Sequence, residues 1–188
     1  HVRPDGDTMG SASALCHALR QAGKTAYLYN NPQFCDNDPW IAAPYLASAD
    51  FQPSFVVAVD MADTTLFPQG FNGPVDFCVD HHPSNTHYAK QTLVQPKKAS
   101  CGEIVMKLCK ALMGKLDATA ADLLYIAVST DTGCFCYGNT TGETLAAGAE
   151  LCRAGARNAA LNKTLFRTSS RARIALEALL MGDFRYYH

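Results

Sequence analysis

The chain has 188 residues, and its 16 lysines and arginines against 17 aspartates and glutamates give a formal net charge of −1. Such a balance argues against tight binding to long nucleic acid, which requires a basic face. Apolar residues make up 48% and charged residues 18%, a composition typical of a folded globular domain. The sequence contains no apolar run long enough to span a membrane and no leader pattern, so we expect one cytoplasmic domain.

The cysteines are predicted to be reduced. Zinc-ribbon spacing is absent, because no two cysteines form a C-x-x-C pair. Five of the eight lie within or beside apolar segments, where cysteine packs as a small hydrophobic residue. A chain of this length does not need disulfides to hold its core. These five are Cys16, Cys78, Cys101, Cys109 and Cys152, and the other three are Cys35, Cys134 and Cys136.

The first half of the chain reads as a helix followed by three strands. Apolar residues at steps of three and four predict a helix over 8–22. Alternation predicts a short strand over 24–29, and the proline-rich segment 30–53 is predicted to be irregular. Continuous apolar runs over 55–59 and 75–79 are typical of strands that are covered on both faces.

The second half is predicted to be helical. Capping-box patterns, Ser100 with Glu103 and Thr140 with Glu143, predict the starts of two helices. An alanine-rich start favours helix over strand for the apolar segment that follows Asp117. Strands that alternate with helices indicate an α/β fold, a mostly parallel sheet of about five strands flanked by helices. The predicted helices span 101–113, 117–128, 140–153 and 169–182.

Acidic and histidine side chains gather at predicted strand ends and turns. Asp60 and Asp80-His81-His82 each end an apolar strand, where open parallel sheets bind ligands. One such aspartate is usually a turn or cap residue, but the combination is harder to dismiss. Pro4 and Gly6 predict that 1–7 curls as a turn and points its acids inward.

The charge of these acids suggests a cation site. Four carboxylates, Asp5, Asp7, Asp60 and Asp131, would repel one another unless positive charge lies between them. Two divalent cations balance that charge and clamp a phosphate in two-metal enzymes. Oxygen ligands with one or two histidines favour Mn²⁺ or Mg²⁺ over Zn²⁺.

These motifs together resemble those of a known superfamily. In order they are His1-x-x-Pro-Asp5-Gly-Asp7, Asp60, Asp80-His81-His82 and Asp131-Thr-Gly. The set resembles the four motifs of the DHH phosphoesterase superfamily. The longer stretches HVRPDGDTMGS and STDTGCFCYGNTT are most similar to its nanoRNase/pAp-phosphatase branch.

The resemblance implies roles for individual residues. His1 and Asp5 would hold one cation; Asp7, His81 and Asp131 would hold the other; and Asp60 would bridge the two. Asp80 would orient a histidine, His82 would contact the scissile phosphate, and a water between the cations would attack phosphorus. Arg3 is assigned to the phosphate, with a solvated arginine as the alternative.

The resemblance also implies a domain organisation. Residues 1–165 would form the DHH catalytic domain without the family's first strand. Residues 166–188 would form a connector helix toward a C-terminal substrate-binding lobe that is absent from this sequence.

The predicted activity is manganese-dependent hydrolysis of phosphoester bonds in short nucleotides. Candidate substrates are oligoribonucleotides of a few residues, linear dinucleotides and 3′-phosphoadenosine 5′-phosphate; long duplexes and membranes are not expected partners. An inorganic pyrophosphatase and a catalytically silent nucleotide-binding module are the alternatives, and a homodimer is left open. Core packing is favoured over base stacking for Phe135 and Tyr137. A solvated turn is favoured over an anion contact for Lys97 and Lys98.

Overall fold

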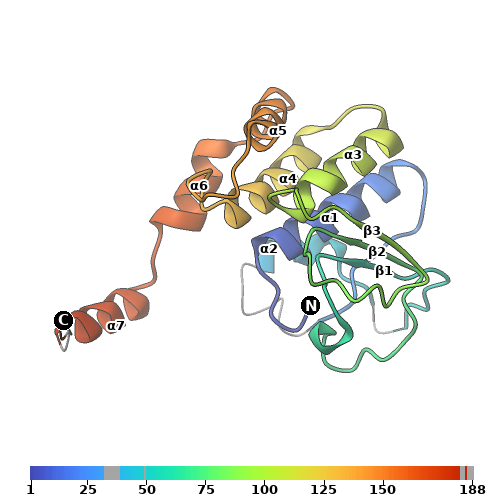
Figure 1. Cartoon of the computed structure of the whole chain (residues 1–188), viewed down its shortest axis with the longest axis horizontal. Coiled ribbons are helices and arrows are strands. Elements are labelled where there is room, and N and C mark those ends of the chain that lie inside the picture. The colour runs from blue at the N-terminus through green and yellow to red at the C-terminus, as the bar shows by residue number, and fades with distance from the viewer. Residues whose placement is uncertain (32–38, 49, 183–184, 186–188) are drawn as a thin grey trace.

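A small parallel sheet lies at one side of the structure, a computed structural model that describes residues 1–31, 39–48, 50–182 and 185 (Figure 1). Its strands are β1 (Val57–Val59), β2 (Phe77–Asp80) and β3 (Gln91–Val94), in the order β1-β2-β3. Both pairings are parallel, so all three strands end at the same edge of the sheet. The predicted α/β class with a parallel sheet is confirmed.

The number of strands is smaller than predicted, three among the described residues instead of about five. Residues 24–29 do not form the expected strand. Leu28 makes one isolated parallel bridge to Leu46, donating its N–H to the carbonyl of Tyr45 and accepting from the N–H of Ala47. These bonds tie Leu28 to the segment before β1 and leave it outside the sheet. β3, which is only partly buried, was not predicted from its sequence.

Three helices form most of the core. α1 (Gly6–Gln21) packs against α3 (Cys101–Met113) and α4 (Ala118–Asp131). Every residue of α4 from Ala120 to Ser129 is buried, which explains why its sequence is apolar all round. The predicted cap at Asp117 is present, because its carboxylate accepts the N–H of Ala120.

A glycine allows α1 and α4 to approach closely. A Cβ placed on Gly10 would lie 2.5 Å from the carbonyl oxygen of Leu123 and 2.9 Å from the backbone nitrogen of Ala127. Real Cβ atoms do not approach backbone atoms so closely. The contact therefore requires glycine, and it brings the second turn of α1 beside the middle of α4.

Of the helices that follow α4, α5 and α6 pack against it and bury Leu151 and Leu161 in the core. The N-cap of α5 is Thr141, one residue after the predicted Thr140, and its capping box consists of Thr141 and Thr144. α6 was not predicted, and α7 projects from the rest of the chain (Figure 1). The remaining elements are α2 (Pro39–Ala42), η2 (Ala43–Tyr45), η3 (Thr64–Leu66), α5 (Gly142–Arg153), α6 (Asn158–Arg167) and α7 (Arg171–Gly182).

Two further expectations concern the described part of the chain. None of its helices has the length and apolar character needed to cross a membrane. The seven cysteines within it are free thiols, of which Cys16, Cys78, Cys101 and Cys109 are buried. Cys35 lies outside the described residues.

Candidate metal centre

The ends of β1 and β2 bring the predicted motifs together. Asp60 directly follows β1, and its backbone N–H donates to the carbonyl of Val79 in β2. Asp80 is the last residue of β2, with His81 and His82 immediately after it. The parallel register therefore places both motifs at the carboxyl edge of the sheet, where ligands of such sheets bind.

Asp7 reaches this edge from the first turn of α1. Gly6 is the first residue of that helix, so the expected turn over 1–7 is wrong for its last two residues: the Asp5 carboxylate caps the helix by accepting the N–H of Thr8. The Asp7 carboxylate is 1% exposed and also accepts the Ser11 hydroxyl at 2.8 Å. Burial raises its pKa well above the ordinary value, and the charges of Asp60 and Asp131 raise it further.

The same carboxylate caps α3. Its two oxygens accept the N–H groups of Cys101 at 2.6 Å and Gly102 at 2.9 Å, the first two residues of that helix. Ser100 is the N-cap residue but makes no capping bond through its side chain, and Glu103 accepts the N–H of Ala99 instead. The predicted Ser100–Glu103 capping box is therefore wrong, because the Asp7 carboxylate takes the place of a Ser100 side-chain cap.

Asp60 has both an unusual backbone and an unpaired oxygen. Its φ of 58° lies in the left-handed region, which aspartate tolerates better than most residues. One carboxylate oxygen, Oδ2, accepts the Thr8 hydroxyl at 2.7 Å. The other, Oδ1, is buried and has no hydrogen-bond partner among the described residues. Burial raises the pKa of Asp60, the Thr8 bond opposes this, and the charge of Asp5 adds to it, for a net rise.

His81 lies at the centre of the acids. Its Nδ1 is 3.1 Å from the carbonyl oxygen of Lys98, which can only accept, so the proton is assigned to Nδ1. Its Nε2 faces three carboxylates, at 3.3 Å from Asp131 Oδ2, 3.5 Å from Asp60 Oδ1 and 3.7 Å from Asp7 Oδ2. An Nε2 held this way can accept a proton or a cation.

Asp80 orients the second histidine. It is fully buried, and its Oδ1 accepts the Nδ1–H of His82 at 2.8 Å. Its Oδ2 accepts the Asn85 amide at 2.6 Å. Burial alone would raise the pKa of Asp80, but the bonds from His82 and Asn85 outweigh it and lower the pKa. The bond to Asp80, against the opposing effect of burial, raises the pKa of the half-exposed His82 to about 9.

Asp131 closes the site from the end of α4, which runs past the predicted end at Val128. Burial raises its pKa to about 6; the charge of His81 opposes this rise, and the charges of Asp60 and Asp5 add to it. Its backbone carbonyl accepts the Asn139 amide at 3.0 Å.

The remaining predicted residues, His1, Arg3 and Asp5, lie outside the cluster formed by the other acids and histidines. Asp5 is exposed, but its charge acts on both Asp60 and Asp131. His1 accepts the N–H of Arg3 through Nδ1, and the Arg3 side chain is exposed.

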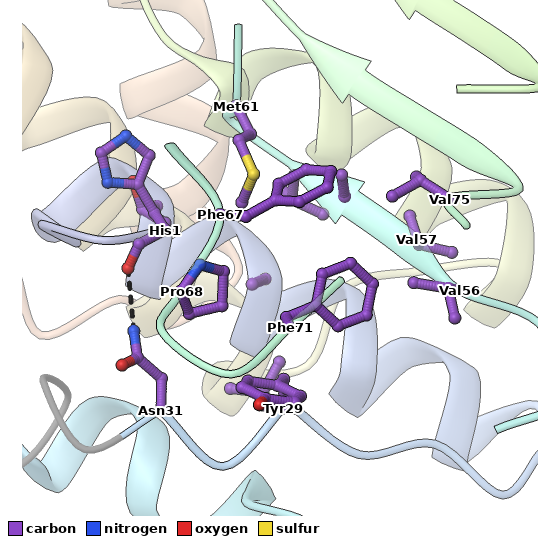
Figure 2. A pocket seen from close by; sticks show the side chains of 15 residues that line it. His1, Tyr29, Asn31, Val56, Val57, Met61, Phe67, Pro68, Phe71 and Val75 are labelled. Atoms are coloured by element: carbon purple, nitrogen blue, oxygen red, sulfur yellow. Dashed lines mark hydrogen bonds between the residues drawn. The ribbon is translucent and has the colours of Figure 1, made fainter. Parts of the chain in front are cut away.

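His1 also borders an apolar cavity of about 110 Å³, where its carbonyl accepts the Asn31 amide at 2.8 Å (Figure 2). Aromatic and aliphatic side chains dominate the lining, which follows β1 and the segment after it. Figure 2 labels, among others, Tyr29, Val57, Phe67, Phe71 and Val75.

Two groups of side chains could each hold a metal ion. Asp60, His81 and His82 form one, and Asp7, His81 and Asp131 form the other, with the ligand atoms of each group within 4.8 Å of one another. The buried, unpaired oxygen of Asp60 and the raised pKa values of three carboxyl groups fit a site built for positive charge. His1 and Asp5 belong to neither group.

Three residues of the site were not predicted from the sequence, and each donates a hydrogen bond to one of its carboxylates. Thr8 binds Asp60, Ser11 binds Asp7 and Asn85 binds Asp80. Ser11 lies four residues after Asp7 on one helix, a spacing at which side chains meet. Thr8 and Asn85 carry no such signal, because their partners lie on other elements or across a turn.

Fold and site together define an α/β protein in which acids and histidines converge at the carboxyl edge of a parallel sheet. Residues 1–128 match the DHH family, N-terminal domain. The chain belongs to the DHH family.

Its relatives include curated enzymes. The chain is 31% identical over 200 residues to the bifunctional oligoribonuclease and PAP phosphatase NrnA of Thermus thermophilus, covering 99% of the chain and 58% of that protein. It is 30% identical over 182 residues to NrnA of Bacillus subtilis, covering 89% of the chain and 56% of that protein. The chain therefore spans little more than half the length of these relatives.

A solved structure shares the fold. An exopolyphosphatase-related protein from Bacteroides fragilis superposes with a TM-score of 0.83 at 22% identity, over 100% of the chain and 60% of that protein.

Proposed function

We propose that the chain is the catalytic domain of a manganese-dependent phosphoesterase that hydrolyses short nucleotides. The substrates would be oligoribonucleotides of a few residues, linear dinucleotides and 3′-phosphoadenosine 5′-phosphate. The observation that carries the proposal is the unpaired Oδ1 of Asp60, 3.5 Å from His81 Nε2 within a ring of carboxylates. The names of the NrnA relatives support the substrate class.

The proposed ligands divide between two cations. Asp7, His81 and Asp131 hold one, His1 and Asp5 contribute to the other, and Asp60 serves both. When bound, the two cations supply an activated water and neutralise charge on the phosphoryl group. The charge of Asp60 acts on both Asp7 and Asp131, which fits its proposed place between the cations.

His82, the second of the two histidines after β2, is proposed to act on the substrate. Its Nδ1–H is held by Asp80, and its raised pKa keeps the ring protonated at neutral pH in the metal-free protein. A protonated His82 can donate a hydrogen bond to a phosphate oxygen and stabilise the charge that develops during attack. Arg3, whose side chain is exposed, is proposed to add a second positive contact.

The last residues are proposed to connect this domain to a further lobe. Within 166–188, α7 projects from the rest of the chain and carries exposed apolar side chains. Exposed apolar surface of this kind marks a contact with another protein surface. The exposed side chains are Ile174, Leu176, Leu179, Leu180 and Met181.

An activity assay tests the function. The protein is incubated with a dinucleotide, with 3′-phosphoadenosine 5′-phosphate and with pyrophosphate, each in Mn²⁺, in Mg²⁺ and in chelator. We expect hydrolysis of the nucleotides in Mn²⁺ and none in chelator. Asp60→Asn should abolish it while preserving the fold. Preferential release of phosphate from pyrophosphate would favour the pyrophosphatase alternative, and nucleotide binding without turnover would favour the silent module.

A further inference from the structure

The carbonyl that fixes His81 belongs to a turn just before α3. Lys98 accepts the Nδ1–H of His81 through its carbonyl oxygen, and its own N–H donates to the carbonyl of Gln95 at 3.0 Å. This carbonyl therefore favours the tautomer of His81 that carries the proton on Nδ1. With the proton on Nδ1, the lone pair of Nε2 is directed at the acids.

The side chain of the same lysine is anchored behind the site. Lys98 is only 12% exposed, although a solvated turn was predicted for it. Its Nζ lies 3.3 Å from Oε2 of Glu103, whose side chain is 3% exposed, and it also pairs with the exposed Glu143. The hydrogen bond to Glu143 raises the pKa of Lys98 against the effect of its burial.

Glu103 connects this lysine to two helix ends. Its other oxygen, Oε1, accepts the N–H of Ala99 at 3.2 Å and the hydroxyl of Thr144 at 2.8 Å. Ala99 follows Lys98 directly, and Thr144 belongs to the capping box of α5. One buried carboxylate thus fixes both sides of the Lys98 carbonyl and attaches the turn to α3 and α5.

The burial of this ion pair is not explained by stability. Removing two charges from water costs free energy that their attraction often does not recover, so an apolar pair would hold the turn against α3 as well. A second ion pair, Lys110 of α3 with Glu150 of α5, remains half exposed. It contacts none of the acids or histidines of the site, and it therefore offers a matched comparison.

We propose that Lys98 and Glu103 are positioning residues for His81. Their buried pair holds the Lys98 carbonyl where it takes the Nδ1 proton, so that Nε2 is presented to a cation. The inference rests on the proposed function for one point, the assignment of His81 as a metal ligand.

Paired double variants test the proposal. Lys98→Met with Glu103→Gln removes both charges, leaves no unpaired charge buried and retains an acceptor for Ala99 and Thr144. Lys110→Met with Glu150→Gln is the matched control. The affinity for Mn²⁺ is measured by calorimetry, and the protonated nitrogen of His81 is identified by ¹⁵N NMR of the metal-free protein.

We expect the first double variant to bind Mn²⁺ about 10-fold to 100-fold more weakly, the range seen when the partner of a ligating histidine is lost. Its His81 should lose the single Nδ1–H form. The control should stay within twofold of the wild type in affinity and keep the Nδ1–H form. Lys98→Arg, which preserves the ion pair, should retain most of the affinity and the same NMR signature.

Wild-type affinity and an unchanged Nδ1–H signal in the first double variant would overturn the proposal. If the wild type itself bound no Mn²⁺, the proposed function would fail, while the NMR comparison would still decide whether the pair positions His81. If the double variant did not fold, Glu103→Gln alone would replace it, because Lys98 then keeps its exposed partner Glu143 while Ala99 and Thr144 keep an acceptor. A mixed tautomer of His81 in that variant would support the proposal, and an unchanged one would contradict it.

Discussion

The carboxylate of Asp7 lies 2.6 Å from the backbone nitrogen of Cys101, a residue 94 positions later in the chain. One acid thus caps α3 and faces the Nε2 of His81 at the same time. The positive end of a helix favours a negative charge at this position. The helix end keeps Asp7 in place while burial and the neighbouring acids raise its pKa.

Metal binding should stabilise the fold. The acids of the site repel one another without a cation, so a cation that binds only the folded state raises its stability. At about 100 times the dissociation constant the gain is about 2.7 kcal/mol. That gain corresponds to roughly 5–10 °C in Tm for a chain of this size.

Differential scanning fluorimetry with Mn²⁺ and with chelator measures this difference. Asp60→Asn should abolish the shift, and Asp63→Asn, at an exposed cap of η3, should preserve it. Equal melting temperatures with and without Mn²⁺ would count against the site.

Stability of the metal-free protein should fall as pH rises. The pKa of Asp131 is raised from 3.8 to about 6. The stability that its protonated form contributes is therefore fully present below pH 3.8 and is lost as pH rises through about 6. His82, raised from 6.5 to about 9, extends the same trend to higher pH. Urea unfolding in chelator between pH 4 and 9 should show it.

Two comparisons sharpen this test. Asp131→Asn should make the fall between pH 4 and 6 shallower, since Asp7 and Asp60 still contribute to it, and raise metal-free stability at pH 7 by roughly 1–3 kcal/mol, because a shift of one pKa unit is worth about 1.4 kcal/mol. Affinity for Mn²⁺ should decline below pH 6, where protons compete for the same carboxylate. A metal-free stability that rose between pH 4 and 6 would show that the acids are not crowded as described.

Gly10→Ala should destabilise the fold. The added methyl group would meet the backbone of α4 at 2.5 Å, and overpacking of this kind costs about 1–3 kcal/mol. Gly142→Ala is the control, because its Cβ would meet nothing within 4 Å and should change stability by less than about 0.5 kcal/mol. Urea unfolding of both variants measures the difference, and equal stabilities would refute the close approach of α1 and α4.

The thiols should react in an order set by burial. Cys136 and Cys152 are exposed, whereas burial raises the pKa of Cys109 to about 12 and that of Cys101 well above its usual value. A thiol reagent followed by peptide mass spectrometry should label Cys136 and Cys152 in the native protein and all cysteines after denaturation. Early labelling of Cys101 would show that the centre of the fold opens readily.

The sequence predicts the strand-end residues well, because the continuous apolar runs show where β1 and β2 stop. Asp60 and His81 meet because these two strands pair in parallel. The cap of α3 could not be predicted, because the Ser100–Glu103 pattern is local and Asp7 arrives from another helix. The bond between His81 and the Lys98 carbonyl could not be predicted either. Every residue has a backbone carbonyl, and only the fold determines which of them His81 contacts. Residues 24–29 have a strand pattern, but the backbone hydrogen bonds of Leu28 go to Tyr45 and Ala47 and not to a strand of the sheet.

His81 belongs to both candidate groups, yet with its proton on Nδ1 it has a single lone pair to offer. One imidazole nitrogen can ligate one cation at a time, so the two groups could not both be complete at once. If two cations bind as proposed, the first would take Nε2, and the second would draw on oxygen donors and the side chains at the margin. The affinity for the second cation would then depend on the first, and a titration curve would not be the sum of two independent isotherms.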